Sequence, residues 1–307
     1  MKTAAMKIGF IGTYPLNGPF APSGKIQYGI SGVFPGSLAP KTNLRVFSSA
    51  ESLLSVSDVL FIGRDATSAY EIGKLAVKEA RHLFIETPFV MEAGQMEELF
   101  VLSGESRSIL FLNQRLLHHP LYEYYRSSLH PDQLVIRIDS AQKHRSAEAM
   151  QDLWFDMASL LCDVIPSGVR RSSVHIVNDS RNVRIPAAYK VRLDFDNGAQ
   201  AVVLVNHLTE AESFEAEFFQ GNGRWDMDLY SGKARHFKTS TRKTTRLKRT
   251  VPPWQELTSK VLHYWLTSVM ENKIPLTINE QGQAVHDLTR ALLNKIHSQK
   301  QLFDRGI

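Results

Sequence analysis

Two carboxylates stand at a spacing that could support acid–base chemistry. Asp152 and Asp156 lie in residues 147–164, where the spacing of apolar residues predicts a long helix. Residues four apart share one face of a helix, so the two carboxylates are expected to be neighbours. One of them could then keep its proton and act as an acid, because like charges repel. The alternative is that both are surface acids that face nearby Arg or Lys side chains.

Other polar side chains are candidates for ligand contact. Asn206 and His207 follow an expected strand at 201–205, and the imidazole could contact a ligand hydroxyl or act as a base. The alternative is a structural histidine. A second group lies near residue 120, where two domains are expected to join, and either lines a pocket or packs the hinge: His118, His119, Tyr122 and Tyr124.

Metal and thiol chemistry are not expected. No third ligand follows Asp152 and Asp156 at a convincing spacing, so we predict no metal site. Cys162 is the only cysteine, so no internal disulfide can form, and we expect it to pack in the core. The absence of disulfides fits a reducing compartment, and the chain has neither a signal-peptide core nor an apolar run of about 20 residues. We therefore expect a cytoplasmic protein without a membrane partner.

Positive charge is concentrated in one stretch. The formal net charge is +5, and much of the positive charge lies in residues 238–249, where Lys and Arg alternate with Thr and Ser. Such a pattern could neutralise phosphates. However, no aromatic residue interleaves it between Phe237 and Trp254, and no nucleic-acid-binding motif is present. We predict a solvated strand or loop and no nucleic-acid partner.

The first part of the chain alternates strands with helices. Continuous apolar runs predict strands, and helical spacing predicts helices at 67–81 and 92–104. The expected strands are 7–12, 25–30, 43–47, 58–63, 82–86 and 108–112. This alternation predicts a doubly wound, mostly parallel sheet, and we place the domain at residues 1–116.

Beyond Pro120 the pattern becomes α+β. Asn197-Gly198 and Gly221-Asn222-Gly223 predict two hairpins, and hence an open, largely antiparallel sheet. Helices are expected at 147–164, 255–272 and 279–301. This second domain spans 117–307, and its final helix is free to pack back on the first domain. Helices cover only one face of such a sheet, so we expect a homodimer or higher homo-oligomer formed through the other face.

Two local motifs point to a known family. Residues 78–89 place a basic residue and His82 before a strand that ends in Glu86, and Asn113-Gln114-Arg115 and His119-Pro120 follow. In order and spacing these motifs resemble the glucose–fructose oxidoreductase, inositol dehydrogenase and rhizopine-catabolism (Gfo/Idh/MocA) family over nearly the whole chain. The resemblance implies an α/β fold, in which a Rossmann-like nucleotide-binding domain joins a domain built on an open-faced sheet. It also implies NAD or NADP as the cofactor and a sugar or polyol as the ligand.

At the catalytic positions that the resemblance implies, the chain departs from the family pattern. Thr87, between Glu86 and Pro88, stands where the family's Glu-Lys-Pro motif has a Lys near the nicotinamide. Asp156 stands where the family has a His four residues after an Asp, which here is Asp152. Thr87 carries no charge, and a second carboxylate normally stays ionised at pH 7. Both substitutions argue against the usual hydride-plus-proton mechanism.

The expected cofactor loop is altered as well. A dinucleotide fingerprint, Gly-x-Gly-x-x-Gly, would begin at Gly12, and only this glycine matches. Pro15, Pro19 and Pro22 follow, and they exclude a regular helix because a proline inside a helix costs about 3 kcal/mol. The second strand continues into 33–36 rather than ending in the acid that would bind a ribose.

Two functions therefore stay open. One is an NAD- or NADP-dependent oxidoreductase of sugar or polyol type with a degenerate cofactor loop and catalytic site. The other is a non-catalytic ligand-binding or assembly protein that keeps the dehydrogenase fold and binds no dinucleotide. The catalytic candidates are Thr87, Asp152, Asp156 and His207. The candidates for cofactor contact are Gly12, Thr13, Tyr14, Glu86 and Pro88.

Overall fold

The chain divides into two compact units. The computed structural model describes residues 6–12, 28–36, 44–86, 91–140, 147–177, 186–239, 244–252, 254–271, 273 and 277–304. Unit 1 comprises Met1–Asn113 and Trp254–Ala284, and unit 2 comprises Gln114–Pro253 and Val285–Ile307. The expected boundary at 116/117 lies close to the division at Asn113, but residues 254–284 group with the first unit instead of the second.

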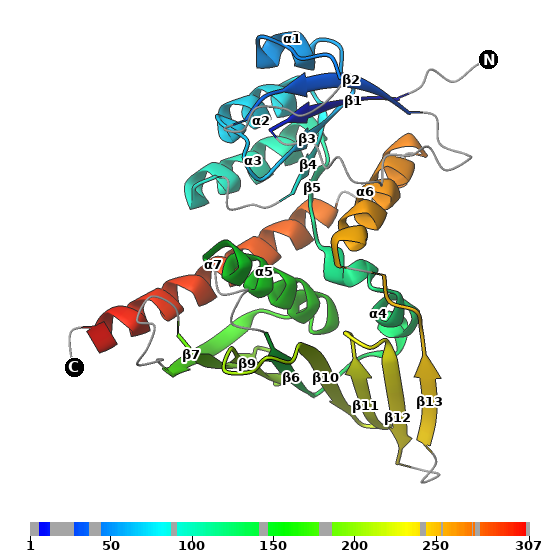
Figure 1. The fold of residues 1–307 in the computed structure, drawn as a ribbon, viewed down its shortest axis with the longest axis vertical. Coiled ribbons are helices and arrows are strands. Elements are labelled where there is room, and N and C mark those ends of the chain that lie inside the picture. Colours follow the sequence, from blue (N-terminus) through cyan, green and yellow to red (C-terminus); the bar gives the residue numbers. More distant parts are fainter. Residues whose placement is uncertain are drawn as a thin grey trace. The chain divides into compact units, whose positions relative to one another are not determined.

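Unit 1 is built on a five-stranded parallel sheet in the order β2-β1-β3-β4-β5 (Figure 1). The strands are β1 (Met6–Ile11), β2 (Tyr28–Phe34), β3 (Val59–Ile62), β4 (His82–Ile85) and β5 (Leu110–Leu112). This topology confirms the predicted Rossmann-like sheet. The expected strand at 43–47 is wrong, because only an isolated bridge joins Val46 to Val33.

A ladder of phenylalanines forms the core on one face of this sheet. Phe10, Phe61, Phe84 and Phe111 are register partners on four adjacent strands. Their ring centroids lie 5.4, 5.1 and 5.6 Å apart in turn, within the range of favourable aromatic pairs. Trp265 of α6 (Trp254–Met270) packs on Phe84 at 5.4 Å, so α6 covers this face.

Unit 1 also contains, among the described residues, α1 (Ala50–Leu54), α2 (Ala69–Lys78) and α3 (Ala93–Ser106). Ser49 caps the first of them, because its hydroxyl accepts a hydrogen bond from Ser52 N at 3.1 Å. The other two pack against each other and against the sheet, α2 on β3 and β4 and α3 on β5. Both faces of the parallel sheet are thus covered, as its uninterrupted apolar strands require.

Unit 2 is built on an eight-stranded sheet in the order β13-β12-β11-β10-β6-β9-β8-β7 (Figure 1). Only β6 and β9 run parallel, so the predicted largely antiparallel sheet is confirmed. Its strands are β6 (Gln133–Asp139), β7 (Val169–Val177), β8 (Ala188–Phe195), β9 (Gln200–Asn206), β10 (Ser213–Gln220), β11 (Gly223–Asp228), β12 (Lys233–Lys238) and β13 (Thr244–Lys248). Both predicted hairpins are present, β8–β9 and β10–β11.

Helices cover one face of this sheet, here called the inner face. On α5 (Ala147–Val164), Trp154 packs edge-on against Tyr189 of β8 with centroids 5.8 Å apart. On α4 (Pro120–Tyr125), Tyr125 packs against Trp225 of β11 at 4.3 Å. The alternate residues of each strand point to the opposite, outer face, where Lys, Arg, Asp and Glu predominate.

The remaining elements of unit 2 are short turns and the end of the last helix. Two 3-10 turns, Arg115–His118 and Arg126–Ser128, flank α4. The division between the units falls within α7 (Thr277–Asp304), and the unit 2 part of this helix carries Lys295, whose Nζ donates to Ser172 O of β7 at 2.8 Å. Among the residues that the structure describes, no helix is long and apolar enough to cross a bilayer.

Candidate functional site

The carboxyl ends of β1, β2 and β3 meet at one edge of the parallel sheet. Gly12 N donates to Phe34 O at 2.9 Å, and Gly63 N donates to Ile11 O at 2.8 Å. Gly12 has a φ of 86°, and an added Cβ would lie 2.6 Å from Asp65 Oδ1 and 3.0 Å from Ala66 N. Only glycine fits here, as in a dinucleotide loop, but the group that approaches it is one of the protein's own carboxylates.

Asp65 occupies the crevice formed by these strand ends. A Cβ added at Gly36, just beyond β2, would lie 2.8 Å from Asp65 Oδ2 and 2.9 Å from Gly12 Cα. In open α/β sheets the pyrophosphate of a dinucleotide lies in this crevice. Two like charges about 4 Å apart repel by about 4 kcal/mol at an effective dielectric constant of about 20. A carboxylate at this place opposes a bound phosphate.

The neighbouring strand end lacks the usual ribose contact. β2 ends at Phe34, and the described residues that follow it in the chain, Pro35 and Gly36, carry no carboxylate. Two of the expected cofactor contacts, Thr13 and Tyr14, lie outside the described residues. Of the described residues at this edge, Gly12 matches the first glycine of a dinucleotide loop, whereas the Asp65 carboxylate does not match the fingerprint.

Glu86 follows β4 at the same edge. Its Oε2 accepts a hydrogen bond from Arg64 N at 3.0 Å, so it holds the loop that carries Asp65. Thr87 and Pro88, the next candidates along the chain, lie outside the described residues. The described part of the Glu-Thr-Pro motif therefore serves the packing of a neighbouring loop.

In unit 2, Asp156 is engaged by an arginine. Its side chain is buried, and Arg115 donates to Oδ2 through Nε at 3.0 Å and through Nη2 at 2.8 Å. Arg115 Nε also lies 3.3 Å from Oδ1. Asp152, one helical turn earlier, is half-buried. The geometry favours the interpretation of Asp156 as an acid that faces an arginine over that of an acid–base catalyst.

His207 lies in the interior between the sheet and α5. It is 1% exposed, with Nδ1 3.3 Å from Ser140 O and Nε2 3.1 Å from Met150 Sδ. Its ring packs edge-on against Tyr189 at 6.0 Å. Both ring nitrogens therefore have partners within the protein, which favours the structural interpretation of this histidine.

Asn206 points to the other side of the sheet from His207. Asn206 Nδ2 donates to Asp139 Oδ1 at 2.9 Å, and Ser213 Oγ donates to Asp139 Oδ2 at 2.8 Å. Asn206 Oδ1 in turn accepts from Leu208 N at 2.9 Å. Asn206 and His207 therefore cannot contact the same ligand, although they are consecutive in the sequence.

The residues near position 120 pack against their own unit. His119 is fully buried and caps α4, its Nδ1 accepting from Leu121 N at 3.3 Å. Tyr122 donates to Asp163, and burial, with this carboxylate beside it, raises the pKa of the phenol. Tyr124 is exposed and lies 4.2 Å below the guanidinium of Arg249. These contacts favour packing over a pocket.

Neither thiol nor metal chemistry finds support in the described residues. Burial raises the pKa of the Cys162 thiol to about 12, and Asp163 and Asp287 add to the shift. The thiol is therefore protonated at pH 7 and is a poor nucleophile. No group of three or more His, Cys, Asp or Glu in the described part of the chain could hold a metal ion.

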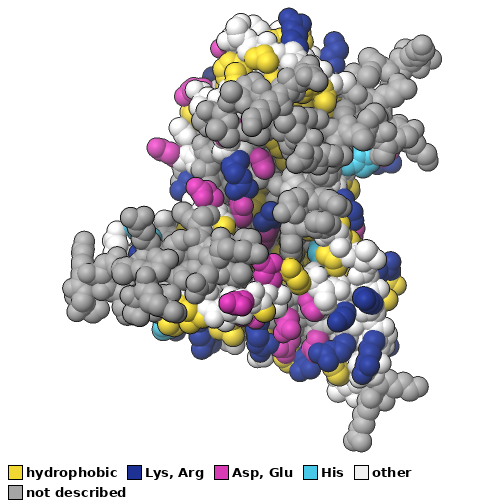
Figure 2. Space-filling view, in the orientation of Figure 1, with side chains coloured by type: hydrophobic (Ala, Val, Ile, Leu, Met, Phe, Trp, Pro, Cys, Tyr) yellow, Lys and Arg dark blue, Asp and Glu magenta, His cyan; other side chains and the backbone are white. Residues whose placement is uncertain are grey.

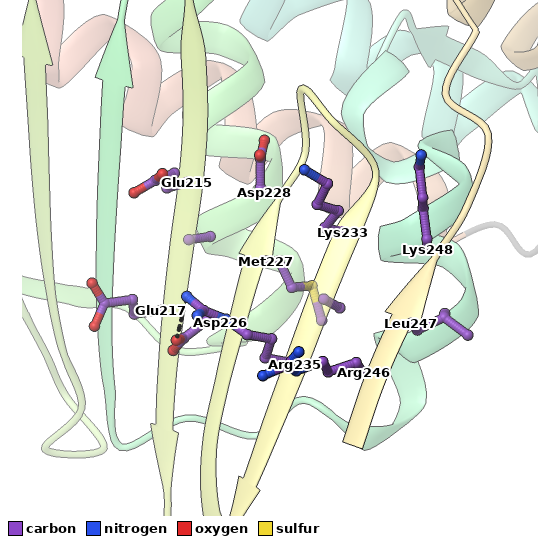
Figure 3. Close-up of a pocket in the computed structure, with 12 residues that line it drawn as sticks. Glu215, Glu217, Asp226, Met227, Asp228, Lys233, Arg235, Arg246, Leu247 and Lys248 are labelled. Carbon is purple, nitrogen blue, oxygen red and sulfur yellow. Dashed lines mark ion pairs between the residues drawn. The ribbon is translucent and has the colours of Figure 1, made fainter. Parts of the chain in front are cut away.

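The sequence reasoning missed two features. The first is Asp65, although a charged residue just after a buried parallel strand belongs to the edge where ligands bind. The second is a hollow of about 630 Å³ over the outer face of β10–β13 (Figure 3). The sequence pattern that could have revealed this hollow is a pair of charged residues two positions apart on each of the four strands: Glu215 and Glu217, Asp226 and Asp228, Lys233 and Arg235, Arg246 and Lys248.

Comparison with known proteins supports the resemblance. No protein-family model matches the sequence. Over 153 residues the chain is 24% identical to UDP-N-acetylglucosamine 3-dehydrogenase of Acidithiobacillus ferrooxidans. This match covers 48% of the chain and 49% of that enzyme, about half of each.

Solved structures resemble the whole fold. The Acidithiobacillus ferrooxidans enzyme superimposes with a TM-score of 0.80 at 15% identity, covering 97% of this chain and 100% of that one. A Gfo/Idh/MocA family oxidoreductase from Vibrio cholerae gives 0.72 at 14% identity, with 96% and 99% covered. Biliverdin reductase from Synechocystis, solved with biliverdin and NADP+, gives 0.68 at 12% identity, with 96% and 98% covered. The chain therefore has the fold of the Gfo/Idh/MocA oxidoreductases, as its motifs indicated.

Proposed function

We propose that this chain keeps a sugar-dehydrogenase fold but no longer transfers hydride, and that it binds a sugar or polyol ligand without turning it over. The observation that carries the proposal is the Asp65 carboxylate in the crevice between Gly12 and Gly36. A dinucleotide must place its pyrophosphate there, beside a like charge. The absence of an acid at the end of β2 and the proline-rich run after Gly12 support the same conclusion.

The candidate catalytic residues support the proposal as well. Oxidation of an alcohol needs a group that takes the hydroxyl proton, within about 3.2 Å of that hydroxyl. Asp156 is bound by Arg115, and His207 is buried between the sheet and α5. Thr87 stands where the resemblance implies a Lys and carries no charge to stabilise a developing oxyanion.

A second candidate function is an NAD- or NADP-dependent oxidoreductase of sugar type. It is favoured by the match to UDP-N-acetylglucosamine 3-dehydrogenase over half the chain. In this alternative the nucleotide would contact Gly12, Thr13, Tyr14, Glu86 and Pro88, and Thr87 would donate a hydrogen bond to the substrate.

Turnover assays separate the two candidates. Wild type and Thr87→Lys are incubated with UDP-N-acetylglucosamine and a panel of sugars and polyols, and NAD(P)H absorbance is followed. We expect no turnover above the rate without enzyme for either protein, because a restored lysine cannot act without a bound nucleotide. Ligand binding without dinucleotide is measured in parallel by thermal-shift titration. Turnover by the wild type would support the second candidate and overturn the first.

The association state and compartment complete the proposal. We expect a homodimer or higher homo-oligomer formed through the outer face of β8, β9 and β10, where Val202 and Leu204 are half-buried apolar residues in the single chain. Static light scattering that gives 34.7 kDa at tens of micromolar protein would contradict it. The single cysteine supports a reducing, cytoplasmic location, and recovery from another compartment on cell fractionation would contradict that.

A further inference from the structure

A hollow lies on the outer face of the sheet in unit 2, and none of the candidate catalytic or cofactor residues lines it. It measures about 630 Å³, within the range of small-molecule sites, and residues of β10–β13 line it (Figure 3). Ala216, Met227 and Ala234 form its floor through their backbone, because their side chains are buried on the inner face. The side chains that surround the hollow are charged.

One side of the hollow is cationic. The register of β12 and β13 places Lys233 opposite Lys248 and Arg235 opposite Arg246. Like charges directly opposite each other destabilise a sheet, so these two pairs oppose folding unless an anion joins them. All four side chains are exposed, and Figure 2 shows Lys and Arg gathered over these strands.

Most of this positive charge is not neutralised within the described part of the chain. Arg235 Nη2 lies 3.4 Å from Asp226 Oδ2, the ion pair drawn in Figure 3. Among the described residues, none forms an ion pair with Lys233, Arg246 or Lys248. Arginine and lysine side chains placed side by side are well suited to hold a phosphate.

The other side of the hollow is acidic. Glu215 lies opposite Asp228 on β10 and β11, and Glu217 lies opposite Asp226. Arg224 Nε binds Asp226 Oδ1 at 2.7 Å and Arg137 pairs with Glu217, so this second pair is neutralised. Glu215 is exposed, and no ion pair to it occurs among the described residues.

This division of charge selects the kind of ligand. A nucleic acid or polyphosphate would lay further negative charge along the acidic side, which costs energy. A ligand with one anionic end and one hydroxyl-rich end fits both sides, because carboxylates accept hydrogen bonds from hydroxyl groups. We propose that this hollow binds a phosphorylated sugar, with its phosphate on Lys233, Arg246 and Lys248 and its hydroxyls on Glu215. Asp228 is not assigned to the ligand, because its carboxylate already accepts from Tyr230 N, Ser231 N and Ser231 Oγ.

No dinucleotide and no candidate catalytic residue takes part in this site. It shares β10 with the face proposed for the homo-oligomer, so a second copy and the ligand would compete for Glu215. Calorimetric titration with glucose 6-phosphate, glucose and inorganic phosphate tests it on the full chain. We expect glucose 6-phosphate to bind at least about tenfold more tightly than either fragment. The double variant Arg246→Gln/Lys248→Gln should weaken it at least about tenfold, and Glu215→Gln should weaken it less.

Lys190→Gln is the matched control. Lys190 is an exposed lysine on β8 in the same cross-strand row as Lys248, but it does not line the hollow. Circular dichroism confirms that each variant is folded. An equal loss in Lys190→Gln, equal affinity for inorganic phosphate, or no binding of glucose 6-phosphate by the wild type would each overturn the proposal. So would a dimer that the double variant abolishes without ligand, since a second copy would then occupy this face.

Discussion

The two sheets of this protein distribute charge in opposite ways. In the parallel sheet of unit 1 both faces are covered and the strands are mostly apolar, while Asp65 and Glu86 lie in the loops that follow the strand ends. In the eight-stranded sheet of unit 2 the inner face is buried, while the outer face carries whole rows of charged residues. A site at strand ends depends on a few loop residues, so a single carboxylate there can prevent a phosphate from binding. A site on an open face is spread over many side chains and tolerates change better.

The largest expected effect lies in the covered sheet. Phe84 stands in the middle of the phenylalanine ladder and contacts Trp265. Phe84→Ala should lower the free energy of unfolding by about 3–5 kcal/mol, because it removes a buried aromatic ring and leaves a cavity. Urea unfolding measures this. Phe219→Ala on the outer face is the matched control and should cost less than half as much; an equal cost would erase the contrast between the two sheets.

The next effect concerns the buried acid of unit 2. Asp156→Ala should destabilise the protein by about 2–3 kcal/mol, because it leaves the Arg115 guanidinium without its bidentate partner. The value lies below that of a fully buried pair, since Arg115 is 24% exposed. Glu148→Ala, on the exposed side of the same helix, should change stability little. If Asp156→Ala left stability unchanged but altered a turnover, Asp156 would be catalytic after all.

A smaller effect is expected at the sheet edge of unit 1. Asp65→Asn removes the charge from the crevice with little change of shape, and it should tighten dinucleotide binding at least about tenfold, or about 1.4 kcal/mol. The gain is a fraction of the Coulomb repulsion, because the fingerprint after Gly12 still lacks two glycines. Asp152→Asn is the matched control. Equal dinucleotide affinities for wild type and Asp65→Asn would show that Asp65 does not weaken dinucleotide binding.

The smallest effect is a pH dependence within the parallel sheet. Ile109 N donates to His82 Nδ1 at 3.0 Å, and burial lowers the pKa of His82. The neutral form is favoured in the folded state, so its contribution to stability is present above the unfolded pKa of about 6.5 and is lost as the pH falls. Between pH 7.5 and 5.5 the wild type should lose more stability than His82→Gln. Parallel losses in thermal denaturation would contradict this.

Strong periodicity made the fold predictable. The helix 147–164 was predicted at the bounds of α5, and both hairpins were found from their glycine turns. The strand expected at 43–47 was wrong, because an apolar run does not say whether a neighbouring strand pairs with it. β7 was missed because 169–173 carries consecutive polar residues that hide its alternation.

The candidate site was less predictable, because its contacts join distant parts of the chain. The spacing of Asp152 and Asp156 was sufficient to place both on α5, but the partner Arg115 lies 41 residues earlier. Likewise Asp65 approaches Gly12 and Gly36 only because β1 lies between β2 and β3 in the sheet. Spacing along one helix or strand predicts which residues are neighbours on that element. Contacts between different elements depend on the order of the strands in the sheet.

Calorimetric titration of the wild type with NAD, NADH, NADP and NADPH tests the central claim most directly. The Asp65 carboxylate in the crevice and the altered loop after Gly12 predict dissociation constants no tighter than about 1 mM for all four, a binding free energy of about −4 kcal/mol. A dissociation constant in the low micromolar range for any of them would contradict this account and would favour an active dehydrogenase instead.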